Sequence, residues 1–182
     1  KCRWPDAVAY LEKAAEFSPE AIDSANLGWA YYNAAREELS YRNDAAARPY
    51  LEKAKAALQK GSMAKGKVAA ASLVNLGRVL ADLGDLNGAA DALNKAVQRD
   101  SDSSFAWNEL GAVYRKQNKF KDAAAAFRKA ADKDEKNPVI QYNLGEAELQ
   151  NGNIGEAKKA YQRLKKLGQS GSQFAARLEQ LS

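Results

Sequence analysis

A leucine–glycine pair recurs along the chain at a fixed interval, and this repetition constrains the fold more than any other feature. The interval is 34 residues, and its members are Leu76-Gly77, Leu110-Gly111 and Leu144-Gly145, followed by Leu178 alone. A period of this length is typical of stacked helical hairpins, because one hairpin cannot cover its own apolar face. The sequence therefore predicts an all-α protein built from repeated pairs of antiparallel helices.

The residues around the pair fit two helices that pack closely. The third copy is the clearest, with Trp107, Leu110, Gly111 and Tyr114 followed by Ala123, Phe127 and Ala130. Spacings of three and four residues place the large side chains on one face of each helix. The small residues allow the two backbones to approach each other.

This arrangement of large and small residues resembles the tetratricopeptide repeat, and the resemblance covers nearly the whole chain. It implies a right-handed superhelical solenoid of antiparallel hairpins. About four repeats are expected, with an N-terminal half-repeat and a C-terminal capping helix. Repeat four departs from the family preference at Gln141, Glu148 and Leu164, which predicts looser packing there.

The first repeat is longer than the others. Its matching residues are Ser24, Leu27, Gly28 and Tyr31 on the first helix and Ala47, Leu51 and Ala54 on the second. From Gly28 to Ala47 is 19 residues, against 12 from Gly111 to Ala123. Seven extra residues are two helical turns and keep the apolar faces aligned. A taller hairpin that projects around residues 39–43 is therefore expected.

The predicted organisation is a single solenoid domain over residues 1–182. Its parts are a half-repeat (1–19), an extended repeat (20–69), three regular repeats (70–103, 104–137 and 138–171) and a capping helix (172–182). Turn and capping residues, such as Asn137-Pro138 and Gly84-Asp85, predict the helix limits. The expected helices are 6–17, 20–38, 45–60, 68–83, 87–99, 104–117, 120–132, 138–150, 154–167 and 172–181.

Composition excludes several classes of function. The chain has no histidine and a single cysteine, so histidine metal sites and Ser-His or Cys-His catalysis are absent from it. We expect neither an enzyme nor a bound metal or cofactor. The net charge of +5 is modest and its signs alternate, which argues against nucleic-acid binding. The sequence contains no run of about 18 apolar residues, so we expect no insertion into a membrane. The compartment, cytoplasmic or exported, is not readable.

The resemblance implies that a protein partner binds on the concave side, where first-helix residues face away from the core. By register these residues are Asn26, Trp29, Asn33, Asn75, Arg78, Phe105, Asn108, Glu109, Arg115, Tyr142, Asn143 and Glu146. Asparagine precedes Leu-Gly three times, and an amide both donates and accepts hydrogen bonds. Such a row would hold an extended or helical segment, with Trp29 as the main anchor. Glu109 interrupts the row.

Some relatives of this type hold the C-terminal tails of Hsp70 and Hsp90 with a clamp of lysines, an arginine and asparagines. At the matching positions of this sequence only Asn75 fits. Binding of those chaperone tails is therefore not expected, and the identity of the partner stays open.

Two alternatives remain beside the adaptor role. Residues 1–19 have the spacing of a second helix that lacks its first, so we expect either that upstream sequence was cut away or that this face pairs with another domain or another copy. That pairing predicts a homodimer, or a structural module of a larger complex, with a contact that includes Trp4, Tyr10 and Leu11. The other alternative is a regulatory domain for an enzyme located upstream.

Overall fold

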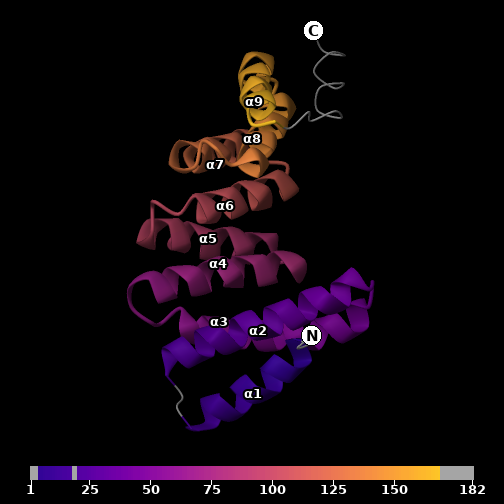
Figure 1. The fold of residues 1–182 in the computed structure, drawn as a ribbon, viewed down its shortest axis with the longest axis vertical. Helices are drawn as coiled ribbons and strands as arrows, with labels where there is room; N and C mark the ends of the chain where they lie inside the picture. The colour runs from indigo at the N-terminus through magenta and orange to yellow at the C-terminus, as the bar shows by residue number, and fades with distance from the viewer. Residues whose placement is uncertain (1–3, 18–19, 169–182) are drawn as a thin grey trace. The chain divides into compact units, whose positions relative to one another are not determined.

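The computed structural model describes residues 4–17 and 20–168, and all regular secondary structure in these ranges is helical (Figure 1). The helices are α1 (Trp4–Phe17), α2 (Ala21–Ser40), α3 (Asp44–Gly61), α4 (Gly66–Asp82), α5 (Leu86–Arg99), α6 (Ser104–Lys116), α7 (Phe120–Lys133), α8 (Pro138–Gln150) and α9 (Ile154–Lys166). These bounds confirm the corresponding predicted helices to within two residues at each end. The helix expected at 172–181 lies outside the described residues.

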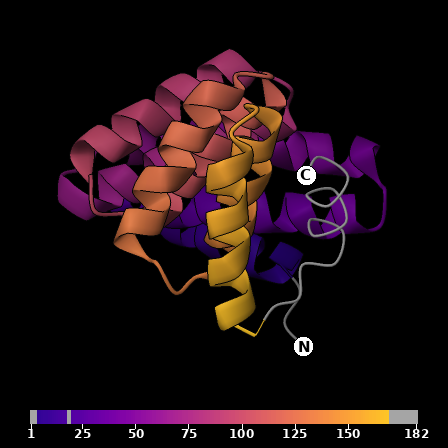
Figure 2. The same ribbon diagram turned by 90° about the horizontal axis from the view of Figure 1, so that it is seen from above.

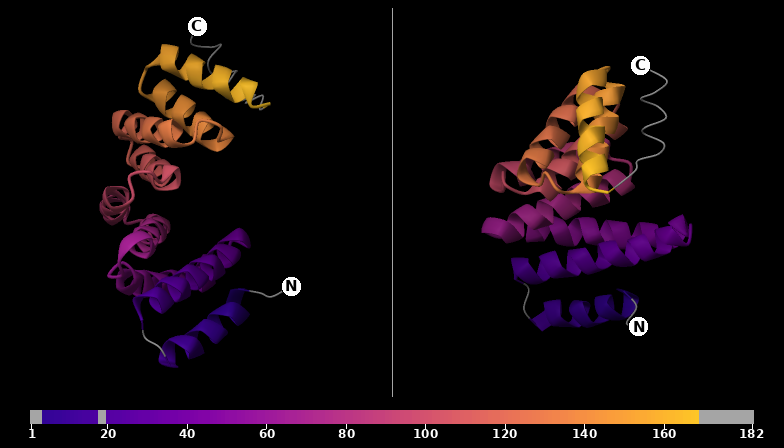
Figure 3. Two further views of the ribbon diagram at one scale, coloured as in Figure 1. Left: turned by 60° about the vertical axis from the view of Figure 1, so that its left-hand side comes forward. Right: turned by 45° about the horizontal axis from the view of Figure 1, so that its top comes forward.

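The helices group into two compact units, Lys1–Ser101 and Asp102–Ser182. In the first unit, α2 pairs with α3 and α4 pairs with α5, while α1 lies against α2 (Figure 3). In the second unit, α6 pairs with α7 and α9 lies against α8 (Figure 2). Each pair is a hairpin closed by a short turn, as the repeat pattern predicts.

A glycine on the first helix faces a large buried residue on the second helix of each of three hairpins. A Cβ added to Gly77 would lie 2.5 Å from Cγ of Leu93, and one added to Gly111 would lie 2.8 Å from Cδ1 of Phe127. Both are too short for a real carbon–carbon contact. The glycines therefore set how closely the paired helices approach.

The first hairpin has a different register from the predicted one. A Cβ added to Gly28 would lie 2.6 Å from Cγ of Leu58, so Leu58, and not Leu51, occupies the place of Phe127. Ala54 then corresponds to Ala123, and the excess over a regular repeat is 14 residues, which adds two turns to each helix. The cause is a repeated spacing, because small–large–small residues recur seven positions later on the same helical face.

The predicted taller hairpin is confirmed. Helices α2 and α3 have 20 and 18 residues, whereas α6 and α7 have 13 and 14. The turn between α2 and α3 is short, with Tyr41 exposed and Arg42 in the left-handed region at φ 58°. The projecting part of the hairpin is therefore helical up to a tight turn.

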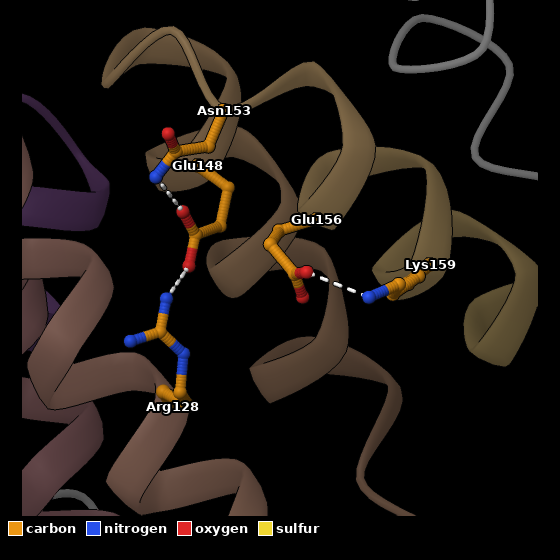
Figure 4. A network of polar contacts seen from close by, with 5 residues as sticks. All are labelled: Arg128, Glu148, Asn153, Glu156 and Lys159. Atoms are coloured by element: carbon orange, nitrogen blue, oxygen red, sulfur yellow. Dashed lines mark hydrogen bonds and ion pairs between the residues drawn. The ribbon is translucent and has the colours of Figure 1, made fainter.

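A buried carboxylate joins the two hairpins of the second unit (Figure 4). The side chain of Glu148 on α8 is 1% exposed, pairs with Arg128 on α7 and accepts a hydrogen bond of 2.8 Å from Nδ2 of Asn153. Gln141 and Leu164, the other two departures of repeat four, are buried as well. Nε2 of Gln141 donates to the backbone carbonyl of Glu135 at 3.0 Å, while its buried Oε1 has no hydrogen-bond partner among the described residues. The looser packing expected in repeat four stays a prediction.

Replacing Gly111 with alanine tests the close approach of α6 and α7. The new Cβ would overlap the fully buried ring of Phe127, and this overpacking costs about 1–3 kcal/mol. Up to about 1 kcal/mol returns through the better helix propensity of alanine. We expect a net loss of about 1–2 kcal/mol in the free energy of unfolding, measured by urea denaturation. Gly155→Ala is the control, because its Cβ would meet nothing within 4 Å. Equal stability of both variants would contradict this account.

The pair between Arg128 and Glu148 gives a second test. Arg128→Met leaves a buried carboxylate without its cation, and we expect a loss of about 1–3 kcal/mol in the free energy of unfolding. Adding Glu148→Leu removes the stranded charge, so the double variant should recover most of that loss. Chemical denaturation of both variants checks this order. A double variant less stable than Arg128→Met alone would show that the carboxylate stabilises the fold without Arg128.

Candidate functional site

In the first unit, the candidate residues of α2 surround an exposed indole. Trp29 is 46% exposed and meets Trp4 of α1 edge to face, with ring centroids 4.8 Å apart at 86°. Asn26 is exposed, and Nδ2 of Asn33 donates to the backbone carbonyl of Trp29 at 2.8 Å. Trp29 is thus held from one side by Trp4, and the amide of Asn33 bonds to its own helix.

Arg78 connects the candidate residues of α4 to α2. Its guanidinium carbon lies 4.8 Å from the ring centroid of Tyr32, and its Nη1 donates to Oδ1 of Asn75 at 3.4 Å. The hydroxyl of Tyr32 donates to Oδ2 of Asp82 at 3.0 Å, and burial raises the pKa of this tyrosine. Asn75 and Arg78 are therefore already engaged within the unit.

In the second unit, two candidate asparagines bond to each other. Nδ2 of Asn143 on α8 donates to Oδ1 of Asn108 on α6 at 2.9 Å, and both residues are half-buried. Phe105, one turn before Asn108, is 49% exposed. These three side chains form a joint surface of α6 and α8, which we call the amide–phenyl surface.

The remaining candidates of the second unit differ in accessibility. Glu109 and Arg115 on α6 are half-buried. Tyr142 packs against the cluster of Leu149 and Ala157, and Glu146 is only 6% exposed. Tyr142 and Glu146 therefore face their neighbours more than solvent.

The aromatic residues of α1 are not equally available for self-association. Tyr10 is exposed, whereas Leu11 is half-buried and Trp4 contacts Trp29. Of the three residues expected at a contact with another copy, Tyr10 is thus the most exposed, and the homodimer stays a prediction.

Sequence reasoning missed a polar cluster between the first three helices. The hydroxyl of Tyr31 donates to Oε1 of Glu12, and Nζ of Lys53 lies 3.2 Å from the same oxygen. This hydrogen bond from Tyr31, together with Lys53, holds the pKa of Glu12 below its usual value. Burial and the bonded carboxylate raise the pKa of Tyr31. The register placed Tyr31 in the core and gave no sign of its carboxylate partner on α1.

A cavity of about 310 Å³ lies beside this cluster. Its lining comes from α2 and α3 and includes Ser24, Leu27, Lys53, Ala57 and Lys60. One signal in the sequence points to it, since Ser24 stands where repeat three has Trp107. A small residue at a place built for a large one leaves space.

The described residues contain no group of three or more acidic, cysteine or histidine side chains placed to hold a metal ion. Among the helices in the described ranges, none combines the length and the apolar character needed to cross a membrane. The polar side chains at the candidate surfaces are amides and charged groups, and two pairs of them, Asn75 with Arg78 and Asn108 with Asn143, bond to each other. Such groups are suited to hydrogen bonding with a ligand.

Comparisons with known proteins agree with this geometry. The tetratricopeptide repeat family matches two stretches, residues 70–103 and 106–172. These stretches correspond to α4–α5 and α6–α9, where two of the three glycine contacts and the buried carboxylate are found. No curated protein matches this sequence.

Several solved structures have a similar fold. A crystal structure of MamA is 17% identical, with 91% of this chain and 88% of that chain covered and a TM-score of 0.69. The 41-end form of MamA from Desulfovibrio magneticus RS-1 is 23% identical, with coverages of 80% and 76% and a TM-score of 0.61. YrrB, a TPR protein with an unusual peptide-binding site, is 19% identical, with coverages of 90% and 77% and a TM-score of 0.62.

At these identities the solved structures show a common fold and nothing further. The two family matches lie on the helices where this chain has its 34-residue period and its close helix pairs. The chain belongs to the tetratricopeptide repeat family, whose repeats are scaffolds for protein–protein interaction.

Proposed function

We propose that this protein is an adaptor and that it binds an extended segment of a partner protein at the amide–phenyl surface. The observation that carries the proposal is the hydrogen bond between Asn108 and Asn143, which joins the first helices of consecutive hairpins. The bond fixes both amides in place before a partner arrives. A surface ordered in advance loses less entropy on binding.

The amide pair keeps hydrogen-bonding capacity after its own bond is formed. Asn108 has two N–H donors, and Asn143 has its carbonyl oxygen and a second N–H. A peptide backbone presents the complementary donors and acceptors at regular intervals. An extended segment that lies across α6 and α8 would form hydrogen bonds with both amides at once.

Phe105 supplies an apolar contact next to the amides. Its ring is half exposed and lies one helical turn from Asn108, so an apolar side chain of the partner would cover it. Each hydrogen bond adds only about 0.5–1.5 kcal/mol net, and the ring adds a comparable amount.

The corresponding surface of the first unit is less prepared for a partner. Asn33 bonds to its own helix, and Asn75 accepts from Arg78. Trp29 is the accessible group there, supported by Trp4. Trp29 is therefore a separate apolar candidate on the first unit, and we assign recognition of the peptide backbone to Asn108 and Asn143 of the second unit.

YrrB is similar in fold and has a peptide-binding site, which supports a peptide as the kind of ligand. No residue of the YrrB site is carried over to this chain. The assignment of Asn108 and Asn143 rests on the contacts of this chain alone. No catalytic step is assigned to the surface, because its side chains are amides and a phenyl ring.

The double variant Asn108→Ala with Asn143→Ala tests the proposal on a peptide array. Loss of two or more hydrogen bonds should weaken the peptides captured by the wild type at least about tenfold, with no change in helix content. Gln98→Ala with Gln162→Ala is the matched control, because both amides are exposed on second helices. Equal capture by the wild type and the Asn108/Asn143 variant would reject the amide–phenyl surface as the binding site.

A further inference from the structure

In three hairpins, one position on the first helix is accompanied by a lysine on the second helix, but the side chain at this position differs in size from hairpin to hairpin. In the three hairpins with a close glycine contact, the lysine follows two residues after the large residue that faces the glycine: Lys60 after Leu58, Lys95 after Leu93 and Lys129 after Phe127. The first-helix residue four positions before the glycine is Ser24, Leu73 or Trp107, respectively. The smallest of the three stands in the first hairpin.

The third hairpin shows what this place is shaped to hold. The ring of Trp107 is partly buried against the core cluster of the second unit. Nζ of Lys129 lies 4.3 Å from the centroid of that ring, which is within the range of a cation–π contact. The place therefore accommodates an indole with a lysine ammonium over its face.

The first hairpin has the lysine but no ring. Ser24 replaces the indole, and the cavity of about 310 Å³ opens between Ser24 and Leu27 on α2 and Ala57 and Lys60 on α3. This volume is at the lower end of the range of small-ligand sites, which is about 300–1,000 Å³. Leu27, Ala56 and Ala57 give the cavity its apolar lining, and Ser24 contributes a hydroxyl.

The charges around the cavity favour an anion. Lys53 and Lys60 both line it, and Lys53 is paired with Glu12, which also accepts from Tyr31. Among the described residues, Lys60 has no ion-pair partner, and its side chain is exposed. One positive charge at the cavity thus remains uncompensated.

We propose that the cavity between α2 and α3 binds a planar aromatic ring that carries a carboxylate, with the ring in the place of the missing indole and the carboxylate beside Lys60. In the first hairpin, the ring of the ligand would make apolar contacts equivalent to those that Trp107 makes in the third hairpin. The carboxylate gains the charge of Lys60, while Lys53 and Ser24 provide further donors. This site is separate from the amide–phenyl surface and does not depend on the proposed adaptor function.

This chemistry has two sources, a free aromatic acid and a peptide that ends in tryptophan. Calorimetric titration of the full chain with indole-3-propionate represents the first, and titration with the peptide Gly-Gly-Trp represents the second. A free acid of this size should bind with a dissociation constant of about 1 mM or tighter. Tighter binding of the peptide identifies a protein terminus as the ligand, and tighter binding of the acid identifies a small molecule.

The neutral analogue indole-3-propionamide tests the role of the charge. We expect it to bind at least about fivefold more weakly than the acid. Lys60→Gln should weaken the acid by a similar factor and remove the preference over the amide. Lys67→Gln is the control, because that lysine is exposed on α4 and does not line the cavity.

Filling the cavity tests its location. Ser24→Trp should abolish binding and raise the melting temperature, since the indole would occupy the cavity beneath Lys60. Gln59→Trp, at an exposed neighbour on α3, should change neither property. The proposal is overturned if neither the acid nor the peptide binds the wild type. It is also overturned if a folded Ser24→Trp variant binds as well as the wild type does.

Discussion

The close contact between a glycine of one helix and a large side chain of the next controls the distance within a hairpin, and the other features follow from that distance. Gly77 with Leu93 and Gly111 with Phe127 bring two backbones together, and the small residues beside these contacts, such as Ala89 and Ala123, are fully buried. The outward sides of the first helices are then left for polar groups. The hydrogen bond between Asn108 and Asn143 then joins α6 to α8, the first helix of the next hairpin.

The helices and their pairing could be predicted from the sequence, since a 34-residue period and turn residues mark them directly. The register of the first hairpin could not, because Ala47-Leu51-Ala54 and Ala54-Leu58-Gly61 have the same spacing on the same face. Only the contact of Gly28 with Leu58 distinguishes them. A pattern read along one helix cannot show which of two equivalent turns meets the partner helix.

The candidate site was predictable as a set of residues, but their bonding was not. Asn75 belongs to the predicted amide row and Asn33 to the wider candidate set, yet Asn33 bonds to its own helix and Asn75 bonds to Arg78. For buried polar groups the sequence misleads in another way, because a residue that breaks the apolar pattern has polar partners in the structure. Glu148 interrupts an apolar pattern, but Arg128 and Asn153 compensate for its burial and make it a link between hairpins. Such partners come from neighbouring helices, which local periodicity does not reveal.

The elongated hairpin of α2 and α3 has a consequence for local opening. Its last two turns on each side lie beyond the length of a regular repeat and include buried residues such as Ala34, Ala35 and Ala47. Backbone amides near Tyr41 should exchange with deuterated solvent by fraying of this end, while amides beside Gly28 exchange only through larger openings. The protruding end is thus the part of this hairpin where we expect local opening to begin.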